Sequence, residues 1–165
     1  MTRPIRLLLV EDNPGDVELM REILEESPYR FEITALADGA EALEYLLHRR
    51  LHDKAANPPP DLMLLDLNLP RVSGDAVLKA LRASDTARAM PIIVVTSSDA
   101  MHDIEMSYAL GANCYLTKPG DLSALRSLIL AVADFWLGVV QLPTYVTSVT
   151  GDRQLGSDDQ TPRHQ

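Results

Sequence analysis

Cysteine is almost absent from this chain: Cys114 is the only one among 165 residues, so no internal disulfide bond can form. No uninterrupted apolar run in the sequence approaches the roughly 18 residues that a membrane-spanning helix needs. The first residues, MTRPIRLLLVEDN, also lack an apolar stretch long enough for a signal peptide. Together these absences predict a soluble protein of the cytoplasm.

Positive charge is scarce as well. The chain has 15 Lys and Arg against 24 Asp and Glu, which gives a formal net charge of −9 and a pI near 4.8. Because binding to phosphate backbones or anionic lipids needs clustered Lys and Arg, this balance disfavours nucleic acid and membrane as partners. It favours protein partners or a bound cation instead. A chain of this length is expected to form one domain with one main site.

Short apolar runs alternate with longer segments of helical periodicity, which is the pattern of βα units around a parallel sheet. We therefore predict an α/β fold with a doubly wound sheet. Asn13 and Pro14 supply an N-cap and a first-turn proline for the first helix, and the last helix is predicted from residue 122 to about 138. The five predicted strands span residues 5–10, 31–36, 62–67, 91–96 and 113–117.

Reactive side chains stand at the carboxyl ends of four of the five predicted strands. They are Glu11, Asp12, Asp66, Thr96 and Lys118. Because the carboxyl ends of parallel strands meet at one edge of a sheet, we expect these side chains to lie close together. Carboxylates suit a hard divalent cation, and a hydroxyl and an ammonium can hold a phosphoryl group. This edge of the sheet is therefore the candidate site.

A bound cation is implied by the acids themselves. Three carboxylates within a few ångströms of one another repel, and the pKa of at least one would rise unless a cation neutralised them. An all-oxygen ligand set favours Mg²⁺, which proteins usually hold through one or two carboxylates, waters and a phosphate. Zinc is disfavoured because its usual Cys and His ligands are missing from these strand ends.

Four motifs occur in order along the chain: VEDN at 10–13, LLDLNLPRVSG at 64–74, VVTSS at 94–98 and GANCYLTKP at 111–119. Each motif alone is a weak indication, whereas their joint spacing is specific. Over residues 5–138 the chain resembles the receiver domain of two-component response regulators. The resemblance implies a flavodoxin-like (βα)5 fold with the strand order 2-1-3-4-5.

For the site, the resemblance implies that Asp66 is the phosphoacceptor, which takes a phosphoryl group from a histidine kinase or a phosphotransfer protein. Asp12 and Asp66 would bind Mg²⁺ directly, together with the backbone carbonyl of Asn68. Glu11 would act through a bound water. It replaces the Asp that is commoner at this position, which keeps the charge and changes its reach. Beyond self-phosphorylation and self-dephosphorylation, no enzymatic activity is expected.

The resemblance also implies which residues hold the phosphoryl oxygens: Lys118 through its ammonium and Thr96 through its hydroxyl. The Lys118–Pro119 peptide bond is expected to be cis, as in the family, which would turn Lys118 toward the site. On phosphorylation, Thr96 would move toward the phosphoryl group and Tyr115 would swing into the space that it leaves. The face made by the fourth helix, fifth strand and fifth helix would then repack. The alternative for Tyr115 is a static, half-buried ring.

The end of the chain supports a narrower resemblance. The segment DFWLGVVQLP at 134–143 and the Pro-rich insertion before the third strand are similar to single-domain regulators that partner phytochrome-type histidine kinases. Homodimers are usual in that subfamily. We therefore expect a symmetric dimer through the face of the fourth and fifth helices and through residues 139–150. Residues 1–138 would form the receiver domain and residues 151–165 a disordered tail.

An alternative assigns the apolar residues around the end of the last helix to a plug, which closes this helix onto its own core. The sequence does not decide between the plug and the dimer interface. The residues concerned are Phe135, Trp136, Leu137 and Val140.

Other functions share some of these features. A haloacid-dehalogenase-type phosphatase also uses a strand-end Asp, Mg²⁺, a Thr or Ser and a Lys, but its motif has a second acid two residues after the nucleophile, where this chain has Asn68. A flavodoxin-type module needs a glycine- and hydroxyl-rich phosphate loop after the first strand, and the acids of EDNPGD would repel a phosphate. A DNA-binding regulator would need more chain after Gly138 for an output domain. The phosphatase is the second candidate.

Overall fold

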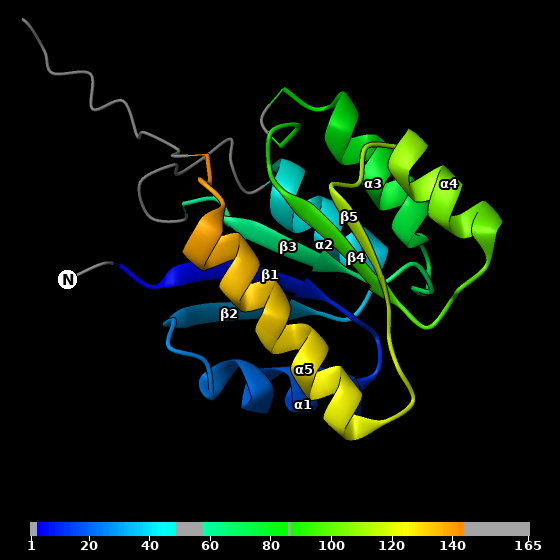
Figure 1. Cartoon of the computed structure of the whole chain (residues 1–165). Helices are drawn as coiled ribbons and strands as arrows, with labels where there is room; N and C mark the ends of the chain where they lie inside the picture. The colour runs from blue at the N-terminus through cyan, green and yellow to red at the C-terminus, as the bar shows by residue number, and fades with distance from the viewer. Residues whose placement is uncertain (1–2, 49–57, 86, 144–165) are drawn as a thin grey trace, which may run out of the picture.

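The computed structural model describes residues 3–48, 58–85 and 87–143. Its centre is a five-stranded parallel sheet in the order β2-β1-β3-β4-β5, with helices on both faces (Figure 1). The predicted doubly wound α/β fold and its strand order are confirmed. The strands are β1 (Ile5–Val10), β2 (Phe31–Leu36), β3 (Leu62–Leu65), β4 (Ile92–Thr96) and β5 (Cys114–Thr117).

Two helices cover one face of the sheet, α1 and α5, and three lie on the other face, α2, α3 and α4 (Figure 1). Both α2 and α5 continue as a π-helical segment, η1 and η3 respectively. The helices are α1 (Pro14–Glu25), α2 (Gly39–Leu43), η1 (Glu44–His48), α3 (Gly74–Ala83), α4 (Met101–Ala109), α5 (Leu122–Ala133) and η3 (Asp134–Val139).

Each face of the sheet is buried in its own apolar cluster. In β1, Leu8 and Val10 belong to the cluster under α2 and α3, whereas Leu7 and Leu9 belong to the cluster under α1 and α5. Consecutive side chains of a strand point to opposite faces, so a strand that is covered on both sides needs apolar residues at every position. The uninterrupted apolar runs of the sequence therefore correspond to strands buried on both faces.

The turns after β1 and β3 place helix starts next to strand ends. Asn13 caps α1, because its Oδ1 accepts hydrogen bonds from two N–H groups of the first turn, at 2.9 and 3.2 Å, and Pro14 is the first helical residue, as predicted. After β3, a Cβ on Gly74 would lie only 2.3 Å from the carbonyl oxygen of Asp66. Glycine is thus required for α3 to begin this close to Asp66.

The last helix ends in a partly exposed apolar segment. The predicted helix over residues 122–138 is confirmed as α5 followed by η3. Trp136 packs against the apolar cluster under α1 and α5, whereas 53% of Phe135 and 69% of Val139 is exposed. Residues 144–165, which include most of the predicted dimer arm and the whole predicted tail, lie outside the described residues.

Candidate functional site

Three carboxylates meet at the carboxyl edge of the sheet. Glu11 and Asp12 follow β1, and Asp66 follows the neighbouring strand β3. One oxygen of each acid lies within 4.8 Å of one oxygen of both others. Glu11 and Asp66 are buried, with 3% and 7% of their surface exposed, whereas Asp12 is exposed. The acids that the sequence places at the strand ends therefore lie together. Their oxygens form a ligand set that suits a hard divalent cation.

Lys118, which follows β5, reaches the same acids. Its Nζ donates hydrogen bonds to Glu11 Oε2, to Asp66 Oδ2 at 3.2 Å and to Asp16 Oδ2 at 3.1 Å, and only 7% of the side chain is exposed. Burial lowers the pKa of Lys118, but the hydrogen bond to Glu11 and the charge of Asp66 outweigh it and leave the pKa raised. Lys118 is therefore a permanent positive charge beside Asp66.

Glu11 carries the clearest electrostatic sign of a site. Burial raises the pKa of Glu11 to about 7, the hydrogen bond from Lys118 opposes this rise, and the charge of Asp66 adds to it. The hydrogen bond from Lys118 thus does not offset the combined effect of burial and the charge of Asp66 on Glu11. A perturbed acid beside other acids at a strand edge is typical of a functional site, and a cation would relieve the repulsion.

The carboxylate of Asp66 is held in one orientation. The backbone N–H of Asn68 donates to its Oδ1 at 3.1 Å, and Lys118 donates to its Oδ2. The backbone N–H of Asp66 donates to the carbonyl oxygen of Val10 at 3.0 Å, which ties the residue to the end of β1. Asp66 is consequently held by Asn68 and Lys118, beside the acids Glu11 and Asp12.

Thr96 is the last residue of β4 and is fully buried. Within the described part of the chain, its Oγ1 has no hydrogen-bond partner. A buried hydroxyl without a partner costs free energy, so such groups in native structures call for an explanation. The carbonyl oxygen of Thr96 accepts a hydrogen bond from the N–H of Lys118 at 2.7 Å, so the two residues lie side by side at the sheet edge. Among the described residues, the Thr96 hydroxyl at this edge of the sheet is thus left without a partner.

Comparison with known proteins assigns the family. Residues 7–130 match the response regulator receiver domain. The chain belongs to the response regulator receiver family. It is accordingly a receiver-domain response regulator of two-component signalling, as the resemblance implies, and the comparisons do not support the phosphatase alternative.

Similar proteins include regulators of phytochrome signalling. Response regulator Rcp1 of Synechocystis sp. is 37% identical over 140 residues, which is 85% of this chain and 94% of Rcp1. The phosphorylated cyanobacterial phytochrome response regulator RcpA is 38% identical, with a TM-score of 0.78 over 86% of this chain and 100% of that chain. The Mn²⁺-bound form of Rcp1 is 37% identical, with a TM-score of 0.78 over 86% and 100% of the two chains.

Tyr115 of this receiver domain is connected to the loop that follows Thr96. Its hydroxyl donates a hydrogen bond to the carbonyl oxygen of Ser98 at 2.9 Å, and the Oγ1 of Thr117 donates to the same carbonyl at 3.3 Å. The ring is half-buried, and burial raises the pKa of its hydroxyl. A displacement of the β4–α4 loop would therefore change the packing of Tyr115.

The expectation that the peptide bond between Lys118 and Pro119 is cis is wrong. No described peptide bond is cis, so this bond is trans. The trans form is the lower in energy by roughly 0.5–1 kcal/mol for an X–Pro bond in the absence of tertiary constraints. Lys118 nevertheless points into the site, because its backbone N–H is bound to the carbonyl of Thr96 and its ammonium to the acids.

Asp16 is a contact of Lys118 that the strand ends do not predict, because it lies in the first turn of α1. The sequence does contain an indication, since this acid stands four residues after Asp12. However, an acid in a first helical turn is already explained by the helix dipole, so it does not by itself indicate a site.

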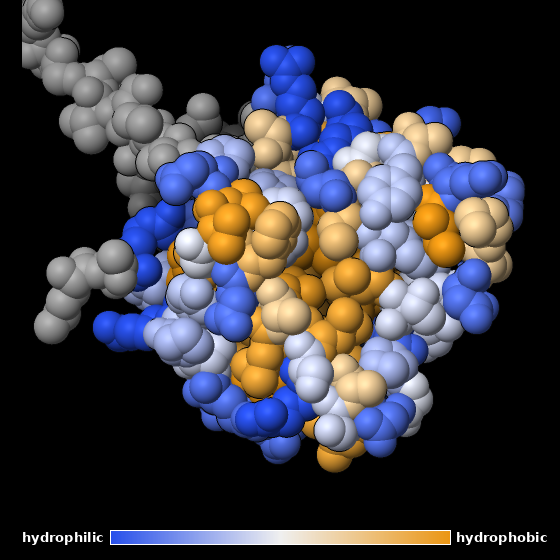
Figure 2. Space-filling view, viewed as in Figure 1, coloured by the Kyte–Doolittle hydropathy of each residue, from blue (hydrophilic) through white to orange (hydrophobic). Residues whose placement is uncertain are grey.

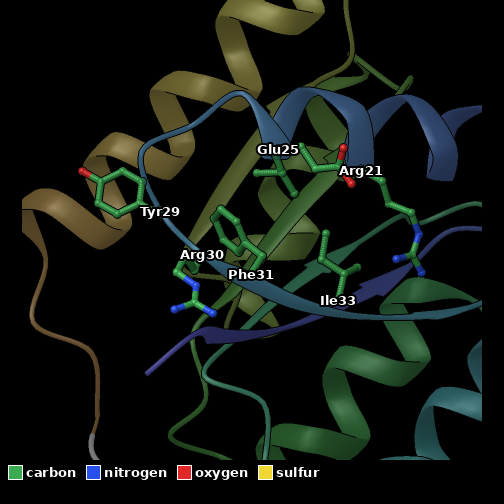
Figure 3. Close-up of a pocket in the computed structure, with 7 residues that line it drawn as sticks. Arg21, Glu25, Tyr29, Arg30, Phe31 and Ile33 are labelled. Atoms are coloured by element: carbon green, nitrogen blue, oxygen red, sulfur yellow. The ribbon is translucent and has the colours of Figure 1, made fainter. Parts of the chain in front are cut away.

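A pocket of about 340 Å³ lies away from the acids of the receiver domain, between the end of α1 and the start of β2 (Figure 3). Because α1 runs back from the carboxyl edge of the sheet, this pocket is near the amino ends of the strands. Ligands of open α/β sheets bind at the carboxyl ends, so the pocket is not the expected reaction site. It is lined by Arg21, Leu24, Glu25, Tyr29, Arg30, Phe31 and Ile33.

Proposed function

We propose that Asp66 is the residue that accepts the phosphoryl group, from a histidine kinase or a phosphotransfer protein. The observation that carries the proposal is the convergence on Asp66 of two different partners. The carboxylate oxygens of Glu11 and Asp12 lie within 4.8 Å of it, and the ammonium of Lys118 is 3.2 Å from its Oδ2. Acids that can hold a cation and a lysine that can hold an anion thus flank one carboxylate.

In this reaction, an oxygen of Asp66 forms a bond to phosphorus while the P–N bond to the donor imidazole breaks. The electron pair of that bond stays on the imidazole nitrogen, and the product is an acyl phosphate on Asp66. Lys118 would neutralise one phosphoryl oxygen, and the unpartnered hydroxyl of Thr96 would donate to another. Phosphoryl transfer depends on alignment and on charge neutralisation more than on covalent help from the protein.

The cation in this proposal is Mg²⁺, bound by Asp12, by Asp66 and by the carbonyl of Asn68, with Glu11 acting through a water. Support comes from the clustered carboxylate oxygens and from the Mn²⁺-bound form of the relative Rcp1, because oxygen ligands suit both ions. When bound, the cation supplies positive charge that neutralises phosphoryl oxygens. Glu11 and Asp12 would place that charge beside Asp66.

The test is incubation with acetyl phosphate and Mg²⁺, followed by intact mass spectrometry. We expect one phosphoryl adduct on the wild type, none on Asp66→Asn, and none on the wild type in the presence of EDTA. Asp85→Asn is the matched control, since it makes the same chemical change at a side chain that is 92% exposed. An adduct on Asp66→Asn would refute the assignment of the phosphoacceptor.

The proposal includes a switch made of Thr96 and Tyr115. Thr96 would move toward the phosphoryl group, and the loop that follows it would move with it. Support comes from the hydrogen bond of the Tyr115 hydroxyl to the carbonyl of Ser98, two residues after Thr96. The loop after Thr96 and the ring of Tyr115 would then change position together, and this would alter the packing of the face made by α4, β5 and α5. Replacement of Tyr115 by Phe should uncouple that face without preventing phosphorylation.

We also propose a homodimer through the face of α4 and α5 and through residues 139–150. Apolar side chains gather on the side of the molecule that carries α5 (Figure 2). Phe135 and Val139 are more than half exposed, and the ring of Phe135 stands edge-on to Trp136 at a centroid distance of 5.8 Å. Exposed apolar clusters of this kind are typical of protein interfaces. Light scattering that returned a monomer mass at all micromolar concentrations would contradict the dimer.

We propose that the plug and the dimer interface use different apolar residues of η3. Trp136 packs against the core of its own subunit, as the plug would require, while Phe135 and Val139 are left for a partner. By length and composition alone, the segment Leu122–Val139 could cross a membrane. In a receiver domain this surface better fits a second copy of the chain, since Leu125 and Ile129 are packed on the sheet.

The partner kinase in this proposal is of the phytochrome class and the compartment is the cytoplasm. The support is the similarity to RcpA, a cyanobacterial phytochrome response regulator. Phosphotransfer from a purified phytochrome kinase at a rate far above that from unrelated kinases would support the partner. The division of the chain at residues 138 and 150 stays a prediction.

A further inference from the structure

The ammonium of Lys118 is fully occupied in the structure. A lysine has three N–H donors, and each of them meets a carboxylate: Glu11, Asp16 at 3.1 Å and Asp66 at 3.2 Å. Only 7% of the side chain is exposed, so water cannot easily replace a lost partner. If Lys118 is to bind a phosphoryl oxygen, it has to release one or more of these acids.

The three acids are not equivalent. Glu11 and Asp66 belong to the cluster whose oxygens lie within 4.8 Å of one another, so a cation in that cluster would compete with Lys118 for both. Asp66 would in addition become covalently bonded to the phosphoryl group. Asp16 is not part of the cluster. Of the three acids, Asp16 is therefore the one that can stay bound to Lys118 while Glu11 and Asp66 bind the cation or the phosphoryl group.

The position of Asp16 suits a fixed anchor. It lies in the first turn of α1, where its backbone N–H donates to the Oδ1 of Asn13 at 3.2 Å. The partial positive charge of the helix N-terminus stabilises a carboxylate at this place. Its side chain is 34% exposed, so holding the charge there costs less than holding it on Glu11. α1 also leads directly from the acid pair at the end of β1.

We propose that Asp16 is a positioning residue, which holds the ammonium of Lys118 beside Asp66 while the cation and the phosphoryl donor bind. It does not contact the reacting atoms, and it acts through Lys118 alone. The inference rests on the proposed function of Asp66 and adds a role for a residue of α1. Its consequence is kinetic: without Asp16, Lys118 loses the partner that keeps it in line with the phosphoryl oxygens.

The test compares Asp16→Asn with the wild type in phosphorylation by acetyl phosphate at saturating Mg²⁺, over a range of donor concentrations. A small donor is used so that contacts between α1 and a kinase do not enter the result. We expect the maximal rate of Asp16→Asn to fall about 3- to 10-fold, because Lys118 stays near Asp66 but is less well aligned, and misalignment can cost up to about 100-fold. The half-saturating donor and Mg²⁺ concentrations should stay within about twofold of wild type. Asp16→Glu should recover most of the rate.

Glu18→Gln is the matched control, since it removes one negative charge from an exposed position on the same helix. Four results would overturn the inference: an unchanged maximal rate in Asp16→Asn, an equal loss in Glu18→Gln, a loss explained by weaker Mg²⁺ binding, or no recovery in Asp16→Glu. Failure of the proposed function would look different, because the wild type itself would then take up no phosphoryl group on Asp66.

Discussion

The raised pKa of Glu11 predicts that Mg²⁺ binding depends on pH in a range where ordinary carboxylates no longer titrate. Glu11 is buried, its pKa is raised to about 7, and it lies in the acid cluster beside Asp66. Even through a bound water, the charged carboxylate of Glu11 would hold a cation at this cluster more tightly than the neutral acid, so cation binding should displace the proton of Glu11 below that pH. The affinity should rise as the pH rises through 7 and level off above 8.

The magnitude follows from the fraction of Glu11 that is ionised. With a pKa of about 7, roughly a tenth of the carboxyl groups are charged at pH 6 and about nine tenths at pH 8, so the apparent dissociation constant of Mg²⁺ should be about tenfold higher at pH 6. An unperturbed glutamate, with a pKa of about 4.3, would leave the affinity nearly constant over this range.

The assay is isothermal titration calorimetry with MgCl₂ at pH 6, 7 and 8, in two buffers of different ionisation enthalpy. The two buffers allow the released protons to be counted: nearly one proton should be released per cation bound at pH 6, and only about a tenth of a proton at pH 8. Glu11→Gln should bind Mg²⁺ more weakly, without the tenfold change, while Glu18→Gln should behave as the wild type. A wild-type dissociation constant that is equal at pH 6 and pH 8 would refute the reasoning, as would a tenfold change that persists in Glu11→Gln.

Three further substitutions test other parts of the structure. Thr96→Val should lower the maximal rate of phosphorylation at least about tenfold, since losing one donor to developing charge can cost about 100-fold or more. It should not lower the midpoint of urea unfolding, since the buried hydroxyl has no partner among the described residues. Asp61→Asn should cost about 1–3 kcal/mol of unfolding free energy at pH 7, because this buried carboxylate accepts two hydrogen bonds of 2.7 Å from Arg3 and one of 2.9 Å from the N–H of Arg6. Asp75→Asn should raise the melting temperature at pH 7, because burial raises the pKa of Asp75 and the atom Oδ1 is buried without a described partner.

The signs of the last two effects with pH differ. Burial would raise the pKa of Asp61, but the hydrogen bonds from Arg3 and Arg6 outweigh it and lower the pKa. The ionised Asp61 therefore stabilises the fold above its unfolded-state pKa, and this stabilisation is lost as the pH falls through its lower folded-state pKa. The stability of Asp61→Asn should accordingly approach that of the wild type in acid. The raised pKa of Asp75 means that its ionisation costs stability, so the gain in Asp75→Asn should shrink as the pH falls. A change in stability that is the same at every pH would contradict the assignment for the residue concerned.

Most of the architecture is predictable because the central strands β1, β3 and β4 are largely buried on both faces. Leu62 to Leu65 are apolar at every position and pack alternately on the two clusters, so their sequence alone indicates a central parallel strand. The carboxyl-edge site follows from the same fact, since parallel strands bring Asp66 and Lys118 to one edge without any need to know the loops. The strand order itself was implied by the family resemblance.

Other features depend on three-dimensional distances that periodicity does not contain. The contact between Asp16 and Lys118 joins residues 102 positions apart, and the helix dipole alone explains an acid at that place. The apolar pattern of the sequence continues unchanged from α5 into the π-helical η3, so the sequence does not indicate where one ends and the other begins. The cis bond at Pro119 is implied by the family resemblance alone, and the backbone reaches the site without it.

The most direct test of Asp66 as the phosphoacceptor is chemical location of the phosphoryl group. Wild-type protein is phosphorylated with acetyl phosphate and Mg²⁺, reduced with borohydride, which converts an aspartyl phosphate to homoserine, and digested for peptide sequencing by mass spectrometry. We expect homoserine at position 66 and at no other acid of the cluster. Homoserine at position 12, or at no position in protein that carries the phosphoryl mass, would contradict the assignment.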